Sequence, residues 1–233
     1  SAMRKETQCV HSGAIKDIMS GGVNSPIFTS TAFNYLDREQ LSYPRYFNTP
    51  NQNVVVAKVC ALEGAEDGVL FSSGMAATDC ALRAMLRPGD HLVIPDDAYG
   101  GTFRLIDKVF TRWGVQYTPV PLSDPDAVLQ AITAKTRLIW VETPTNPLLS
   151  IADIGAIAQL AASHNAKVLV DNTFASPALQ QPLTLGADIV LHSTTKYIGG
   201  HSDVVGGALL TNDEELDAAF GFLQNGAGAV PGP

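Results

Sequence analysis

Cysteine is scarce in this sequence, and its arrangement argues against a protein stabilised by disulfides or by zinc. The chain of 233 residues contains three cysteines, Cys9, Cys60 and Cys80. Their number is odd, their spacings are long, and no Cys-x-x-Cys or Cys/His cluster occurs. We therefore predict neither a disulfide framework nor a zinc site. Reduced thiols are typical of the cytoplasm, and we expect a cytoplasmic protein.

Long apolar runs and basic clusters are also missing. No run approaches the ~20 apolar residues that span a bilayer, and the N-terminal stretch SAMRKETQ lacks the apolar core of a signal peptide. The formal net charge is −8. Without a basic patch, nothing in the sequence favours nucleic acid or an anionic membrane surface. We therefore expect a partner from neither class.

A regular alternation of strand and helix patterns occupies the chain from Asn51 onward. Continuous apolar runs such as LIWV and VLV are typical of strands that are buried on both faces. The predicted strands are 68–74, 91–95, 115–121, 136–143, 167–172, 188–193 and 206–211. The predicted helices are 53–65, 75–90, 101–114, 124–132, 153–165 and 212–225. This order predicts an α/β fold with a mostly parallel sheet and helices on both faces.

Two further features define the organisation of the chain. Residues 1–50 are rich in Gly, Ser, Thr, Asn and Pro, and this segment, the N-terminal arm, is predicted to be extended with turns. Residues 51–233 form the predicted sheet domain. No Gly-x-Gly-x-x-Gly follows its first strand, which argues against a dinucleotide-binding domain.

Polar side chains follow the predicted strands where ligands bind in such sheets, beyond the carboxyl ends. In LFSSGMAAT, Ser73 and Gly74 separate a strand from a helix, and the free N–H groups of a helix start can hold a phosphate. An ordinary strand-to-helix turn is the alternative. In WVETPTNP, Glu142 and Asn146 lie in a loop made rigid by two prolines, which could also be a simple polar turn.

Two more strand ends carry ionisable groups. Asp171 directly follows an apolar strand, where a desolvated carboxylate needs a cation or strong donors; a helix cap or an ion pair is the alternative. Lys196 follows the strand 188–193, near the hydroxyls of Ser193 and Thr195. A lysine becomes a nucleophile when burial or nearby positive charge lowers its pKa, although a surface charge is the alternative.

Together these groups match pyridoxal 5′-phosphate (PLP). A phosphate seat, a carboxylate for the ring nitrogen and a lysine for the aldehyde are its requirements. Tyr99, just after the strand 91–95, supplies a candidate aromatic partner for the ring face.

The motifs SSGMAA, YGGT, ETPTNP, VDNTFASP and HSTTKYIGGHSD resemble, in order, those of the Cys/Met-metabolism family of PLP-dependent enzymes. The resemblance implies the aspartate-aminotransferase-like fold (fold type I) and an amino-acid substrate. It implies that Lys196 forms a Schiff base with the cofactor and moves protons, and that Asp171 pairs with the ring nitrogen. The other implied cofactor contacts are Ser73, Gly74, Met75, Tyr99, Glu142, Asn146, Ser193 and Thr195, with Tyr99 also acting on the substrate.

The resemblance also implies an assembly. Tyr43 and Arg45 match a Tyr-x-Arg pair that reaches the cofactor phosphate of a neighbouring subunit, so a homodimer at least, and usually a homotetramer, is expected. Family members continue into a smaller C-terminal domain, so we expect this chain to be the PLP-binding large domain without it.

The family contains several reactions that eliminate or replace a group at the β or γ carbon. Gly101 stands where methionine γ-lyases tend to carry Cys, and Arg104 resembles an arginine of cystathionine γ-synthases and γ-lyases that suits a second substrate carboxylate. These two enzymes are the favoured prediction. The alternatives are cystathionine β-lyase, a homoserine-ester sulfhydrylase, methionine γ-lyase and an inactive PLP-binding fragment.

Overall fold

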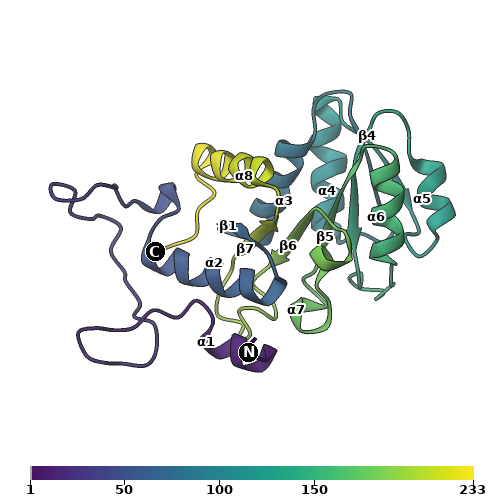
Figure 1. The fold of residues 1–233 in the computed structure, drawn as a ribbon. Helices are drawn as coiled ribbons and strands as arrows, with labels where there is room; N and C mark the ends of the chain where they lie inside the picture. Colours follow the sequence, from purple (N-terminus) through teal and green to yellow (C-terminus); the bar gives the residue numbers. More distant parts are fainter. Residues whose placement is uncertain (1) are drawn as a thin grey trace.

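A seven-stranded sheet forms the centre of the protein, whose computed structural model describes residues 2–233 (Figure 1). The strand order is β1-β7-β6-β5-β4-β2-β3. Strand β7 runs antiparallel to both of its neighbours, β1 and β6, and the other pairs are parallel. The strands are β1 (Asp67–Phe71), β2 (His91–Pro95), β3 (Gln116–Val120), β4 (Thr136–Glu142), β5 (Lys167–Asp171), β6 (Ile189–Ser193) and β7 (Gly207–Thr211).

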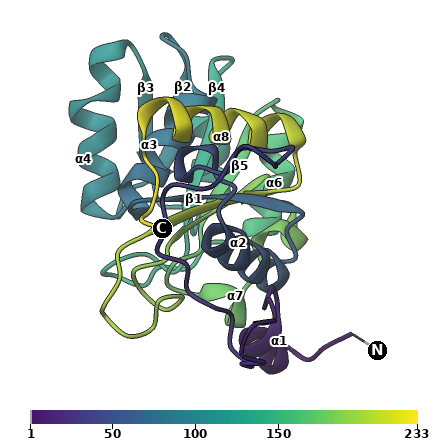
Figure 2. The same cartoon turned by 90° about the vertical axis from the view of Figure 1, so that its left-hand side faces the viewer.

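Helices cover both faces of this sheet (Figures 1 and 2). The helices are α1 (Lys5–His11), α2 (Pro50–Glu63), α3 (Gly74–Met85), α4 (Gly100–Lys108), α5 (Pro125–Ala131), α6 (Ile154–Ser163), α7 (Ser176–Leu179) and α8 (Glu214–Ala227). The predicted α/β fold with a mostly parallel sheet is therefore confirmed. No helix within residues 2–233 combines the length and the apolar character needed to cross a membrane.

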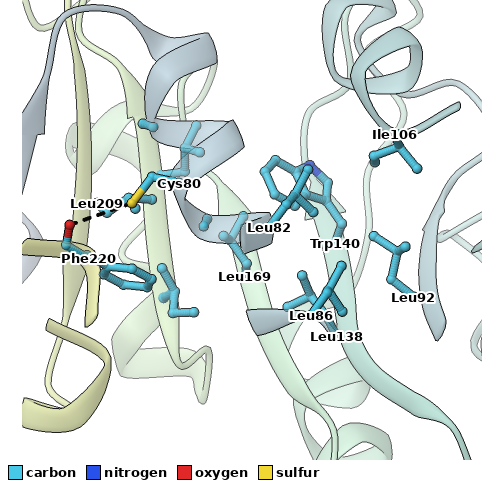
Figure 3. Packing of buried hydrophobic residues seen from close by; sticks show 14 of the residues in the cluster. Cys80, Leu82, Leu86, Leu92, Ile106, Leu138, Trp140, Leu169, Leu209 and Phe220 are labelled. Carbon is cyan, nitrogen blue, oxygen red and sulfur yellow. Dashed lines mark hydrogen bonds between the residues drawn. The ribbon is translucent and has the colours of Figure 1, made fainter. Parts of the chain in front are cut away.

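The core is divided by the sheet because successive strand residues point to opposite faces. On one face, Leu138, Trp140 and Leu169 pack with Leu82 of α3 and Phe220 of α8. Figure 3 shows this cluster, with Cys80 Sγ 3.6 Å from the Phe220 carbonyl oxygen. The alternate strand residues form two clusters on the opposite face, one with α5 and α6 and one with α2. The strands are thus held rigidly from both sides.

Helix starts follow the expected chemistry. Asp153, predicted as a cap, accepts a hydrogen bond from Ala156 N–H and begins α6, and Asp124 and Asp213 begin α5 and α8 in the same way. The predicted helix 101–114 ends as an α-helix at Lys108 and continues as a 3-10 turn over Phe110–Trp113.

The N-terminal arm is less extended than predicted. It contains α1 and a 3-10 turn at Pro44–Tyr46. Helix α1 is short, and tertiary contacts stabilise it: it packs against α2, and Lys5 Nζ donates to the Pro177 carbonyl at 2.6 Å. Between α1 and α2 the chain loops away from the sheet (Figure 1).

Candidate active site

A cavity of about 250 Å³ lies beyond the carboxyl ends of β4, β5 and β6. This is the edge where the sequence placed the polar groups. The predicted residues that line the cavity are Ser73, Gly74, Met75, Tyr99, Glu142, Asn146, Asp171, Ser193, Thr195 and Lys196. Residues that are more than 100 positions apart in the sequence are thus brought to one site by the parallel strands.

The start of α3 forms one wall of the cavity. Ser73 precedes the helix, and its Oγ accepts a hydrogen bond from Ala76 N–H at 3.0 Å. The N–H groups of the first helical turn have no partner within the helix. A Cβ atom on Gly74 would lie 2.8 Å from Ser193 Cβ. Glycine therefore allows the helix start to approach the end of β6 closely, and the wall suits an anion.

Asp171, the last residue of β5, supplies a carboxylate to the lining of the cavity. Its Oδ1 accepts hydrogen bonds from the Thr173 hydroxyl at 2.6 Å and the Thr173 N–H at 3.1 Å. Burial raises the pKa of Asp171 despite these bonds. A cationic partner in the cavity would therefore be favourable for this carboxylate.

Sequence reasoning missed Thr173, which joins two parts of the site. Its hydroxyl donates to Asp171 and accepts from the Ser193 N–H at 2.9 Å. It thus connects the end of β5 to the end of β6. One pattern in the sequence could have identified Thr173. It lies two residues after the strand-end Asp171, and an aspartate side chain often accepts a hydrogen bond from the residue two positions later.

Glu142 ends β4 and holds two loops of the site together. Its Oε2 accepts from the Tyr99 N–H at 2.7 Å, and its Oε1 accepts from the Asn146 N–H at 2.9 Å. Burial, with the nearby charge of Asp171 as a smaller cause, raises the pKa of Glu142 to about 7. The two hydrogen bonds of this carboxyl group position Tyr99 and Asn146 relative to each other.

A second carboxylate, Asp97, fixes the same loops and was not predicted. Its Oδ2 accepts from the Thr145 hydroxyl at 2.7 Å and the Ser150 hydroxyl at 2.8 Å. Thr145 Oγ1 also accepts from the Ser150 N–H at 2.9 Å. The loop that carries Asn146 is thus bonded to the segment that carries Tyr99.

Tyr99 precedes α4 and presents its ring to the cavity. A Cβ atom on Gly101 would lie 2.7 Å from Tyr99 Cε1 and 3.1 Å from Met75 Sδ. The absence of a side chain at Gly101 therefore leaves room for the ring in this position.

Lys196 lies in the turn after β6, where its N–H donates to the Ser193 carbonyl at 3.3 Å. Its side chain lines the cavity and makes no ion pair with any group of residues 2–233. Thr195 Oγ1 accepts from the Gly206 N–H at 3.2 Å, which anchors the turn to the segment before β7. The lysine amine is thus available to a ligand.

Three predicted residues lie away from the cavity lining. Arg45 Nη2 donates to the Asn225 carbonyl at 3.0 Å, and the Tyr43 ring meets Tyr46 edge-on at 5.4 Å. Arg104 is exposed on α4. The roles expected for Tyr43 and Arg45 concern a second subunit, so these roles and that of Arg104 stay predictions.

The cavity suits PLP in its donor set. It combines a desolvated carboxylate that a cation would stabilise, N–H groups of the α3 start beside a close glycine contact, and a lysine amine in the lining. These are the partners of a pyridine nitrogen, a phosphate and an aldehyde.

The sequence profile of a family described as Cys/Met metabolism PLP-dependent enzymes matches residues 6–233. The chain belongs to this family. The resemblance stated from the five motifs is confirmed, and so is PLP as the cofactor.

Two named relatives agree with this family assignment. A Mycobacterium tuberculosis protein named cystathionine gamma-synthase is 69% identical over 231 residues, which are 97% of this chain and 59% of that protein. A cystathionine beta-lyase of Lactococcus lactis subsp. cremoris is 47% identical, over 98% of this chain and 60% of its own length.

Solved structures give the same result. The structure of metB from Corynebacterium glutamicum matches with a TM-score of 0.95 and 54% identity, over 99% of this chain and 61% of that one. The chain thus spans about three fifths of the length of these relatives.

Proposed function

We propose that this chain is the cofactor-binding part of a PLP-dependent transsulfuration enzyme that acts on a sulfur-related amino acid. The observation that carries the proposal is the convergence of Asp171, the α3 start and Lys196 on one cavity. When bound, PLP supplies an electron sink that stabilises negative charge at the α carbon of an amino acid. Elimination or replacement at the β or γ carbon then becomes accessible.

The residues that line the cavity would hold the cofactor in one orientation. Asp171 would pair with the protonated ring nitrogen, which its desolvated position favours. The N–H groups of Gly74 and Met75, with the hydroxyls of Ser73, Ser193 and Thr195, would hold the phosphate. Tyr99 would cover a ring face, and Asn146, supported by Glu142, would lie near the ring hydroxyl.

Lys196 would serve in two ways. Its Nζ is the amine that would hold the cofactor aldehyde between turnovers. When it does not hold the aldehyde, the same Nζ would take a proton from the substrate α carbon and return one to a neighbouring carbon. Tyr99, which lines the same cavity, would be the second group to touch the substrate.

Among the reactions of the family, we propose cystathionine γ-synthase first and cystathionine γ-lyase second. The 69% identity to a protein named cystathionine gamma-synthase supports this order. Gly101 argues against methionine γ-lyase, because a Cβ atom there would lie 2.7 Å from Tyr99 Cε1 and the cysteine of methionine γ-lyases would require the ring to shift. Arg104 is proposed to favour substrates with a second carboxylate.

We also propose that the protein assembles into a homodimer at least, and into a homotetramer as the family resemblance implies. Ile18, Met19 and Val23 of the N-terminal arm are 93%, 95% and 94% exposed. Apolar side chains exposed to this degree in one segment suit burial against another subunit. Arg45 and Tyr43 would then lie near the neighbouring site.

A cofactor titration tests the proposal. Adding PLP to the wild-type protein should produce a visible absorption band, and Lys196→Ala should abolish it because the amine is lost. Lys135→Ala, which removes an exposed lysine elsewhere, should leave the band unchanged. A band that persists in Lys196→Ala would show that another group holds the aldehyde.

Substrate assays separate the reactions from one another and from a non-catalytic fragment. The protein should act on a homoserine ester with cysteine and on cystathionine, but not on methionine alone. Arg104→Ala should slow dicarboxylate substrates selectively, and an equal loss for monocarboxylates would contradict its role. A normal band without any turnover would indicate a cofactor-binding fragment.

A further inference from the structure

The end of α8 lies against the turn that precedes α3. Helix α8 packs against both α3 and β1 (Figure 1). Gln224, near the end of α8, is 0% exposed, and its Nε2 donates to the Leu70 carbonyl at 2.8 Å. Just beyond the helix, the Ala229 carbonyl accepts a hydrogen bond from the Ser72 N–H at 3.1 Å. We call Gln224, Gly228 and Ala229 the α8 clasp.

Both hydrogen bonds reach the outer side of an edge strand. Strand β1 stands at one end of the sheet and pairs only with β7 within residues 2–233. Leu70 and Ser72 are two residues apart, so their backbone groups point to the same side of an extended chain. The α8 clasp therefore takes the place that a further strand would occupy, and it extends one residue past Phe71, where β1 ends.

The turn at Ser72 and Ser73 is also held by its neighbours in the sheet. A Cβ atom on Gly207 would overlap the Ser73 carbonyl oxygen, and one on Gly74 would lie 2.8 Å from Ser193 Cβ. The end of β6 and the start of β7 thus hold the turn by close packing. The α8 clasp adds a hydrogen bond on the outer side, directly before the N–H groups that begin α3.

The geometry of the α8 clasp depends on Gly228 and Gln224. Gly228 ends α8 with a left-handed φ of 71°, and the chain turns so that the Ala229 N–H donates to the Gln224 carbonyl at 3.0 Å. Gln224 Oε1 is buried and has no hydrogen-bond partner within residues 2–233. An apolar side chain would avoid this unpaired acceptor. What the amide supplies in return is its bond to Leu70.

We propose that the α8 clasp positions the part of the cavity that receives the cofactor phosphate. By fixing Ser72, it determines where Ser73 and the first N–H groups of α3 lie in the cavity lining. An anion at this wall would contact those groups. The inference rests on the proposed role of the α3 start in holding the phosphate. The three clasp residues lie outside the lining, so they are positioning residues that act through Ser72.

A comparison of PLP with pyridoxal isolates the phosphate. Pyridoxal has the same ring and aldehyde, so Asp171 and Lys196 would contact both ligands, whereas only PLP has a group for the α3 start. A clasp that only covers the sheet edge should, when loosened, weaken both ligands alike. A clasp that positions the phosphate contacts should, when loosened, weaken PLP selectively. The measured quantity is the ratio of PLP affinity to pyridoxal affinity.

Gly228→Val is the main variant. A Cβ atom at this position meets no atom within 4 Å, so the substitution acts through the backbone alone. A β-branched residue is strained at a φ of 71°, and relief of this strain should move Ala229 away from Ser72. We expect PLP affinity to fall about fivefold and pyridoxal affinity to change by less than about twofold. Gly228→Asn tolerates the left-handed backbone and should keep most of the wild-type ratio.

Gly226→Val is the matched control. Gly226 lies in the same helix with a helical backbone and with open space at its Cβ position, so the ratio should not change. Gln224→Met keeps the length of the side chain but removes the donor to Leu70, and it should lower the ratio as Gly228→Val does. In the cofactor-free protein, hydrogen exchange at the Ser72 amide should be faster in both clasp variants, because its partner is displaced.

An unchanged ratio in Gly228→Val and Gln224→Met would overturn the inference and leave the proposed function intact. Exchange at Ser72 that is no faster in either variant would overturn it as well, because the clasp would not be what holds the turn. The proposed function fails by a different result. A wild-type protein that binds PLP no better than pyridoxal would refute the phosphate role of the α3 start, and one that binds neither ligand would refute the cofactor site.

Discussion

The carboxyl-end edge of the sheet is held by contacts within the chain, whereas the N-terminal arm exposes many of its apolar side chains. Glu142, Asp171 and Thr173 each have hydrogen-bond partners at the sheet edge. Ile18, Met19 and Val23 are almost fully exposed. The sheet edge is therefore organised before any ligand arrives, while the arm depends on a second subunit under our proposal. The two regions should respond to different experiments.

The largest effect is expected from Asp171→Asn. It removes the negative charge that would pair with the ring nitrogen, so PLP affinity should fall about 100-fold, near 3 kcal/mol. Equilibrium titration with PLP measures this change. The oligomeric state should stay that of the wild type, and a change in assembly would break the separation between the two regions.

The second effect concerns Glu142 and the stability of the cofactor-free protein. Its pKa is raised from 4.5 to about 7, so its stabilising contribution is full below pH 4.5 and is lost as the pH rises through about 7. The upper limit of this loss is about 3 kcal/mol, and we expect about 2 kcal/mol.

Glu142→Gln lacks this titration. Denaturant unfolding across the same pH window should therefore show a smaller loss of stability with rising pH in the variant than in the wild type. Parallel curves would mean that the carboxyl group titrates at its ordinary pKa in the folded protein.

Thr173→Val tests the connection between β5 and β6. The variant removes the donor to Asp171 and the acceptor of the Ser193 N–H. We expect about a tenfold loss of PLP affinity, or ~1.4 kcal/mol. Thr173→Ser keeps the hydroxyl and should recover most of the affinity. If the Thr173→Val and Thr173→Ser variants bind PLP equally well, the hydroxyl has no positioning role.

The smallest effect on the sheet is expected from the arm. Replacing Ile18, Met19 and Val23 with Ser should change the free energy of unfolding of the isolated chain by less than about 0.5 kcal/mol, because these side chains contact little. Analytical ultracentrifugation should nevertheless show weaker assembly. Unchanged assembly would show that these three side chains do not contribute to the interface between subunits.

The strand ends were predictable because one signal marks each of them locally. An apolar run followed at once by Asp171, or by hydroxyls and Lys196, is visible within ten residues. The caps of α5, α6 and α8 are equally local. The parallel order of the strands then places those ends at one edge without further information.

The supporting contacts could not be predicted in the same way. Thr173 and Ser193 are 20 residues apart, Asp97 and Thr145 are 48 apart, and Glu63 and His192 are 129 apart. Each pair depends on strand order and on the register between strands, and no short pattern in the sequence records either one. Helix α1 was missed for a related reason, since its contacts with α2 and Pro177 stabilise it.

The central claim is that the cavity at the sheet edge holds PLP through Lys196. Borohydride reduction of the PLP-loaded protein, followed by proteolysis and mass spectrometry, tests it most directly. We predict one pyridoxyl group per chain, on the peptide that contains Lys196. A pyridoxyl group on another lysine, with the Lys196 peptide unmodified, would contradict the claim.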